Sequence, residues 1–218
     1  MPTWYQTALL RLAEESSGMQ NIRQYLETLM LWQQSIPTPK GYAYGSITEF
    51  LLKHGKEYPS QPLNPEELKA VEDLFDLHSK PQRHCYYNSQ QMATGHMKLT
   101  YVEGLAVSHT IGMPFPHAWN AINGKVVDTT WRHANGGRAI LGTYPKDMAY
   151  FGVPISTKSI VKLWCATGQS YAFLDMPINE YMFRKPYDPE ATEHLPPEFV
   201  DEWRQAHKET KRRRKKAF

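Results

Sequence analysis

A chain of 218 residues with 41% hydrophobic and 12% aromatic residues is large enough to bury one substantial core. Its two cysteines are too few for a disulfide framework, which favours a reducing compartment. We find neither a signal-peptide pattern nor the run of ~18 apolar residues that spans a bilayer. We therefore expect a cytoplasmic protein with no membrane partner. If the protein is phage-encoded, the compartment would be the host cytoplasm.

Residues 1–80 are expected to form a helical N-terminal region packed on the core. Apolar residues recur at helical spacing in 8–13 and again in 22–32. Ser46-Ile47-Thr48-Glu49 has the spacing of a capping box, and Gly55 suits the end of that helix. Residues 64–67, Asn-Pro-Glu-Glu, predict the start of another helix, with a cap, a first-turn proline and first-turn acids.

Cys85 is a candidate nucleophile. The residues that follow it include few strand formers and no proline, which predicts a helix that starts near residues 81–85 and ends near Gly95. A thiol at a helix N-terminus is activated because the helix dipole stabilises the thiolate. The backbone N–H of Cys85 would then face an acyl oxyanion, and Gln82 and Asn88 are the nearest side-chain candidates for a second oxyanion donor.

The Asn123-Gly124 pair, with apolar residues on both sides, predicts a two-residue hairpin turn and, with it, a strand register. His117 then faces Thr130 across the hairpin. Because side chains alternate along a strand, His117 and Asp128 share one face as diagonal neighbours, at about 7–8 Å between backbone positions. A carboxylate can meet an imidazole N–H at that separation, so we expect Asp128 to orient His117 as a general acid and base.

The stretch from residue 84 to residue 131 resembles the transglutaminase-like branch of the papain-like thiol enzymes. The resemblance consists of a cysteine on a helix N-terminus, the phrase His117-Ala118-Trp119 on a strand, and a hairpin return that ends in Asp128-Thr129-Thr130. It departs from the family at Tyr86, where a tryptophan is frequent, and at Thr129, where the family often has proline. The chain also lacks the calcium-binding elements of the animal transglutaminases.

The resemblance implies an α+β fold, with the nucleophile helix packed on an antiparallel sheet, and a catalytic core in residues 81–185. It implies Cys85 as nucleophile, His117 as general acid and base, and Asp128 as the residue that orients His117. It does not determine the reaction, because this fold serves proteolysis, amide hydrolysis and acyl transfer alike. We expect no cofactor.

Strands are predicted in residues 99–107, 117–122, 125–130 and 159–166. The second cysteine, Cys165, falls in the last of these and is expected to be a core residue. Residues 132–154 are rich in glycine, proline and tyrosine and are interpreted as a loop beside a cleft. Tyr144 in that loop is a candidate for a substrate groove, as are Glu103 and Trp119. A structural hydrogen bond for Glu103 and core packing for Trp119 are the alternatives.

Residues 186–218 are predicted to be a C-terminal extension. Pro186 to Pro197 is acidic and proline-rich, and residues 198–208 could form a helix. The extension then carries six consecutive positively charged residues, which we expect to be disordered because like charges repel. We expect this basic segment to attract nucleic acid or an acidic protein surface. The alternative is that it only keeps the chain soluble. The six residues are Lys211, Arg212, Arg213, Arg214, Lys215 and Lys216.

The leading hypothesis is therefore a thiol enzyme that cleaves or transfers an acyl group of a peptide, protein or small amide. Hydrolysis is slightly favoured because no feature identifies an amine site. The alternative is a non-catalytic protein of the same fold that docks on nucleic acid or an assembly through its basic tail. A metal-binding protein is a third interpretation, since histidines crowd the region around Cys85, although no usual metal-ligand spacing is present.

Overall fold

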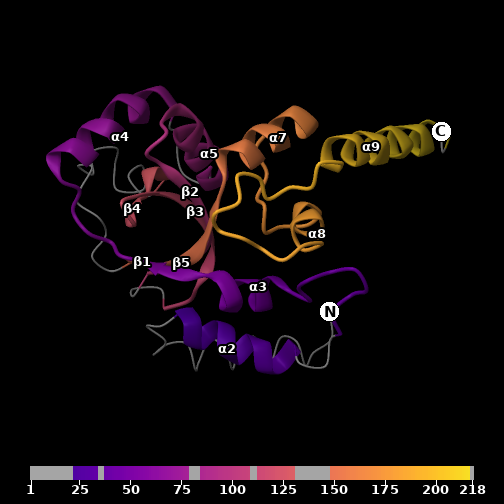
Figure 1. Ribbon diagram of the computed structural model, residues 1–218, viewed down its shortest axis with the longest axis horizontal. Coiled ribbons are helices and arrows are strands. Elements are labelled where there is room, and N and C mark those ends of the chain that lie inside the picture. Colours follow the sequence, from indigo (N-terminus) through magenta and orange to yellow (C-terminus); the bar gives the residue numbers. More distant parts are fainter. Residues whose placement is uncertain (1–21, 34–36, 79–83, 109–111, 131–147, 217–218) are drawn as a thin grey trace.

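In the part of the chain that the structure describes, an antiparallel sheet of five strands has helices beside it (Figure 1), so the fold is α+β. The structure is a computed structural model and describes residues 22–33, 37–78, 84–108, 112–130 and 148–216. The strand order in space is β1-β5-β2-β3-β4, and every neighbouring pair is antiparallel. The strands are β1 Lys56–Tyr58, β2 Thr100–Ser108, β3 Phe115–Ile122, β4 Lys125–Val127 and β5 Met148–Ile155.

The hairpin between β3 and β4 has the turn and register that the sequence predicts. Ile122 pairs with Lys125 and Asn120 with Val127. Asn123 and Gly124 both have positive φ, 51° and 81°, as a two-residue hairpin turn of this type requires. The predicted return strand is too long, however. β4 stops at Val127, and Thr129 and Thr130 are helical, so Asp128 lies where the chain leaves the sheet.

The helices that precede the cysteine agree with the cap patterns. α2 spans Ile22–Gln33, α3 spans Ile47–His54 and α4 spans Pro65–His78. The Ser46 hydroxyl accepts from the Glu49 N–H at the start of α3, as a capping residue does. At the start of α4, Asn64 and Glu67 accept from each other's backbone N–H, both at 2.9 Å, which is a complete capping box.

β5 and α7 correct two predictions for the second half of the chain. The segment interpreted as loop up to Pro154 contains β5, and the predicted strand at 159–166 is helix α7, Thr157–Thr167. Pro154 pairs with Val102 of β2 but lies beyond the residues of β5 that pair with β1, and its carbonyl accepts from the Tyr187 hydroxyl. In α7, Ile160 and Leu163 are buried at helical spacing, and Cys165 is exposed rather than in the core.

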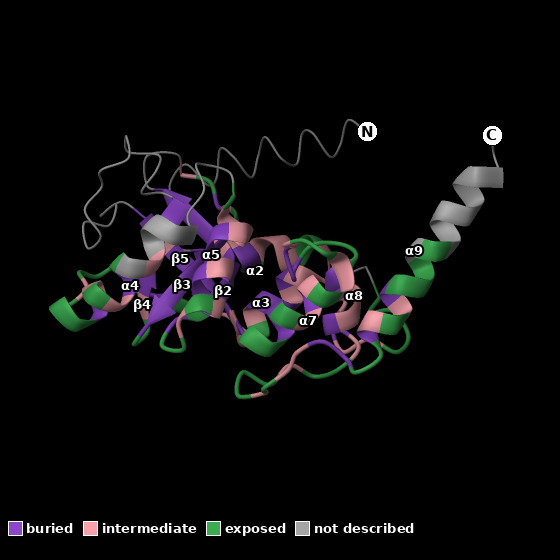
Figure 2. Cartoon of the chain, turned by 90° about the horizontal axis from the view of Figure 1, so that it is seen from above, coloured by how far each residue is buried: buried purple, intermediate pink, exposed green. Residues whose placement is uncertain are grey.

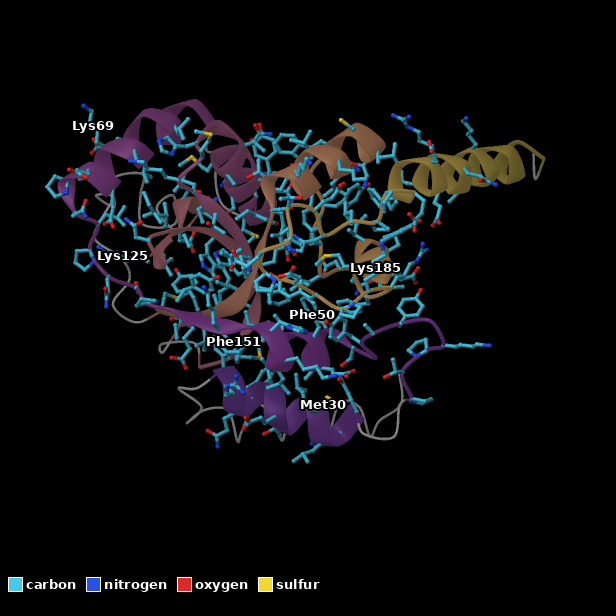
Figure 3. All side chains as sticks on the ribbon, in the orientation of Figure 1. Met30, Phe50, Lys69, Lys125, Phe151 and Lys185 are labelled. Atoms are coloured by element: carbon cyan, nitrogen blue, oxygen red, sulfur yellow. The ribbon has the colours of Figure 1, made fainter. Side chains whose placement is uncertain are left out.

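The two faces of the sheet carry separate hydrophobic clusters. On one face, β-strand residues such as Tyr101 and Phe151 form a cluster with Phe50 of α3 and with residues of α2, α7 and α9. Figure 3 labels Phe50 and Phe151. This first cluster joins residues from all three predicted regions, from Ile22 to Trp203. The other face carries a smaller cluster, and Figure 2 shows how thoroughly the strands are buried. Its members are Tyr58, Val102, Ala106, Trp119, Ala121, Val126, Met148 and Tyr150.

The C-terminal part contains α8, Ile178–Met182, and the long helix α9, Phe199–Lys216. α9 runs through all six basic residues, so the prediction that they are disordered is wrong. Asp201 and Glu202 lie in the first turn of α9 and the basic residues lie in its last turns, which is the order that the helix dipole favours. Lysine and arginine are also good helix formers. α9 extends past the rest of the described chain in Figure 1.

None of the helices in the described ranges is both long and apolar enough to cross a membrane.

Candidate active site

Cys85 is the first residue of helix α5, Cys85–Gly95, as the sequence predicts. The first N–H groups of a helix have no acceptor within it, so they are available to an anion beside the Cys85 sulfur. The thiol is half-buried. The helix that carries it is held firmly, because Asn88, Gln90 and Met92 in its middle are fully buried.

Two polar contacts attach α5 to the β3–β4 hairpin. The Asn120 side-chain amide, in β3, donates to the Ser89 carbonyl at 2.8 Å. The Asn88 amide donates to the Thr130 hydroxyl at 3.1 Å. Both contacts are buried, so they fix the start of α5 beside the strand that carries His117.

His117 lies in β3 and is buried, with Asp128 as its hydrogen-bond partner. The His117 Nε2 to Asp128 Oδ2 distance is 2.6 Å. Aromatic rings surround the imidazole: Trp119 stacks nearly parallel to it at 6.3 Å, and Phe115 meets it edge-on at 5.7 Å. The ring is therefore oriented by one carboxylate and enclosed by apolar walls.

The charge state of His117 is set by its neighbours rather than by its burial. Burial alone would lower the pKa of the ring. The Asp128 carboxylate and a hydrogen bond with the Cys85 sulfur oppose that effect and raise the pKa of His117 to about 10. Because Nε2 is engaged with Asp128, Nδ1 is the ring nitrogen that remains for the thiol. The structure thus brings Cys85, His117 and Asp128 together in one contact chain.

Asp128 is held by more than the hairpin. Its Oδ1 accepts from the Thr130 N–H at 3.0 Å, as an N-cap residue does before a helical turn. Its Oδ2 accepts both the His117 N–H and the Tyr150 hydroxyl, the latter at 3.0 Å. The sequence could have indicated the Thr130 contact, because an aspartate two residues before it is a cap pattern. Nothing in the sequence links Tyr150, in β5, to Asp128.

Two facing glycines make room for the aromatic wall of the site. Gly104 in β2 pairs with His117 on one side and with Gly152 in β5 on the other. A Cβ on Gly152 would lie 2.7 Å from Cη2 of Trp119 and 2.4 Å from the Glu103 carbonyl oxygen. Only glycine at position 152 lets the indole lie against the backbone there. Trp119 is fully buried, so it forms a wall behind His117 and offers no surface to a groove.

Glu103 is also buried and has three hydrogen-bond donors. It accepts from the Phe173 N–H at 2.7 Å, from the Leu174 N–H at 3.0 Å and from the Tyr101 hydroxyl. Burial raises the pKa of Glu103 to about 7, and these donors reduce that shift. These contacts favour the structural alternative for Glu103 over a substrate contact. Its carboxylate anchors residues 173–174 to β2.

Gln90 is a residue that the sequence did not single out. Its amide donates to the Tyr171 carbonyl at 2.7 Å and to the Tyr101 hydroxyl at 3.2 Å, and its oxygen accepts from the Trp164 indole at 2.9 Å. It thereby joins α5 to β2, α7 and residue 171. A lone glutamine in a helix gives no signal of this role.

The remaining predicted residues are placed as follows. Asn88, an oxyanion candidate, is buried and bonded to Thr130. Gln82 and Tyr144 lie outside the described residues. Within the ranges that the structure describes, no three of the side chains that commonly bind metals are grouped closely enough to hold an ion. The six basic residues 211–216 lie on the last turns of α9.

Comparison of the chain with protein-family models, with curated proteins and with solved structures found no match.

Proposed function

We propose that the protein is a thiol enzyme of the transglutaminase-like, papain-like type that forms an acyl-enzyme on Cys85. The observation that carries the proposal is the contact chain in which His117 bonds Asp128 at 2.6 Å and also bonds the Cys85 sulfur. An imidazole with a raised pKa is protonated at neutral pH. A protonated ring beside a thiol at a helix N-terminus stabilises the thiolate, which is the reactive form.

The chemistry follows from the position of each group. The Cys85 thiolate attacks an amide carbonyl, and the negative charge moves to the carbonyl oxygen near the N–H groups at the start of α5. His117 gives its proton to the leaving amine, the C–N bond breaks, and a thioester remains on Cys85. Water, deprotonated by His117, then releases an acid, which makes the protein a peptidase or amidase. An amine in place of water would make it an acyltransferase.

The test is the pH dependence of Cys85 alkylation by iodoacetamide, with Cys165→Ala in every protein because Cys165 is exposed. We expect modification to persist well below about pH 7 in this parent. In His117→Ala the reactivity should instead follow an ordinary thiol, with a midpoint at about pH 8.5, because the imidazolium is gone. Identical ordinary titrations in the two proteins would refute an activated nucleophile.

A second function is proposed for α9, independent of the thiol chemistry. The net charge of the chain is +3, so without the six charges of residues 211–216 it would be −3. Residues 211–216 are the last residues of helix α9, which extends past the rest of the described chain in Figure 1. No aromatic residue is interleaved among them, which favours the backbone of a duplex over stacking on single-stranded bases.

The expected result is salt-dependent binding of a fluorescent DNA duplex by the full chain, with little preference for sequence. With up to six phosphates neutralised, the slope of log affinity against log salt should be about −5. Replacing all six basic residues by glutamine, which keeps helix propensity, should remove that slope. The control is Lys40→Gln with Lys98→Gln, two exposed lysines elsewhere. Equal binding by the parent and the six-glutamine variant would exclude the role.

A further inference from the structure

Tyr150 donates its hydroxyl to the same carboxylate oxygen that bonds His117. The distances to Asp128 Oδ2 are 3.0 Å from the Tyr150 oxygen and 2.6 Å from His117 Nε2. The other oxygen, Oδ1, accepts the Thr130 N–H at 3.0 Å. Both oxygens of Asp128 are thus occupied, and the carboxylate cannot rotate without losing a donor.

Tyr150 reaches Asp128 from a distant strand. It lies in β5, whereas Asp128 follows β4, and β2 and β3 lie between them. Tyr150 pairs directly with Ala106, and the other β2 residue on its path, Gly104, has no side chain. These small residues leave space for the phenol ring on this face of the sheet. The ring centroid lies 6.3 Å from that of His117, so Tyr150 contacts both partners of the ion pair.

The hydroxyl, rather than the ring, distinguishes this residue. Tyr150 is only 2% exposed, and a phenylalanine would fill the same space without a polar group to satisfy. Tyr58, in the next strand on the same face, provides the contrast: it is also buried, and its hydroxyl has no hydrogen-bond partner among the described residues. Of these two tyrosines, only Tyr150 directs its hydroxyl at Asp128.

We infer that Tyr150 is a positioning residue that holds the Asp128 carboxylate in line with the His117 ring. The inference rests on the proposed thiol chemistry and names a further member of its site. Without the Tyr150 hydroxyl, Asp128 Oδ2 loses one of its donors and can turn away from the ring. The misaligned carboxylate stabilises the imidazolium less, and through it the Cys85 thiolate.

The experiment compares Tyr150→Phe and Tyr58→Phe, each in the Cys165→Ala parent, by the rate of Cys85 alkylation across pH. At about pH 6 we expect Tyr150→Phe to react roughly tenfold more slowly than the parent, with its inflection moved about one unit toward that of a free thiol. Tyr58→Phe should follow the parent. As a second readout, the proton NMR signal of the His117–Asp128 hydrogen bond should shift or broaden in Tyr150→Phe alone.

The outcomes separate this role from the function on which it rests. An ordinary thiol titration in the parent would remove both the thiol enzyme and the role of Tyr150. Low-pH reactivity in the parent that is unchanged, or moved to still lower pH, in Tyr150→Phe would remove the role of Tyr150 alone. An equal loss in Tyr58→Phe would also overturn it, because the effect would then come from packing on this face.

Discussion

On the proposed thiol chemistry, Asp128→Asn is expected to slow the acylation of Cys85 by about 10⁴-fold, the effect of the same change in a Ser-His-Asp triad. The reason lies in the donors that surround the carboxylate. The Thr130 N–H points at Oδ1, whereas His117 and Tyr150 both point at Oδ2. An asparagine has only one acceptor oxygen, so in either orientation its NH₂ group faces a donor. The imidazolium also loses its counter-charge.

The measurement is the second-order rate constant for the nitrophenol burst from p-nitrophenyl acetate, in the Cys165→Ala parent and in Asp128→Asn. Asp201→Asn is the matched control, because it removes an exposed carboxylate in the first turn of α9. We expect the control to stay within about threefold of the parent. If Asp128→Asn kept its fold by circular dichroism and acylated within tenfold of the parent, Asp128 would have no part in the chemistry.

The local parts of the site could be predicted because each depends on a few neighbouring residues. Asn123 and Gly124 determine the turn, and the turn determines the register of His117. The helix from Cys85 to Gly95 follows from the composition of eleven consecutive residues. Capping patterns likewise located the starts of α3 and α4. In each case, the sequence spacing and the three-dimensional contact involve the same short segment.

The parts that were missed depend on contacts between distant segments. Gly152 and Pro154 indicate a loop when considered alone, yet β5 forms because it pairs with β2 along eight residues. The apolar run in α7 was ambiguous between strand and helix, as short runs are, and its Ser156 and Gly168 caps decide for helix. The Tyr150 contact joins residues 22 positions apart across two intervening strands, β2 and β3, which no local pattern encodes.

Trp119→Ala should produce the largest loss of stability at the site, about 3–5 kcal/mol of the free energy of unfolding. The indole is fully buried, packs against Tyr150 at 5.2 Å and against Tyr58 at 5.7 Å, and lies over Gly152. Its removal leaves a cavity that rigid strands on both sides cannot fill. Trp119→Phe should cost much less, because a ring remains and the indole N–H has no hydrogen-bond partner among the described residues.

Urea unfolding followed by far-UV circular dichroism measures these differences without depending on tryptophan fluorescence. The control is Trp32→Ala, which truncates an indole that is 49% exposed on α2 and should stay within about 0.5 kcal/mol of the parent. Equal losses in Trp119→Ala and Trp32→Ala would mean that the indole of Trp119 is not a core group. A large loss of stability confined to Trp119→Ala would instead mean that the indole behind His117 also stabilises the sheet. The geometry of the site and the stability of the fold would then depend on the same side chain.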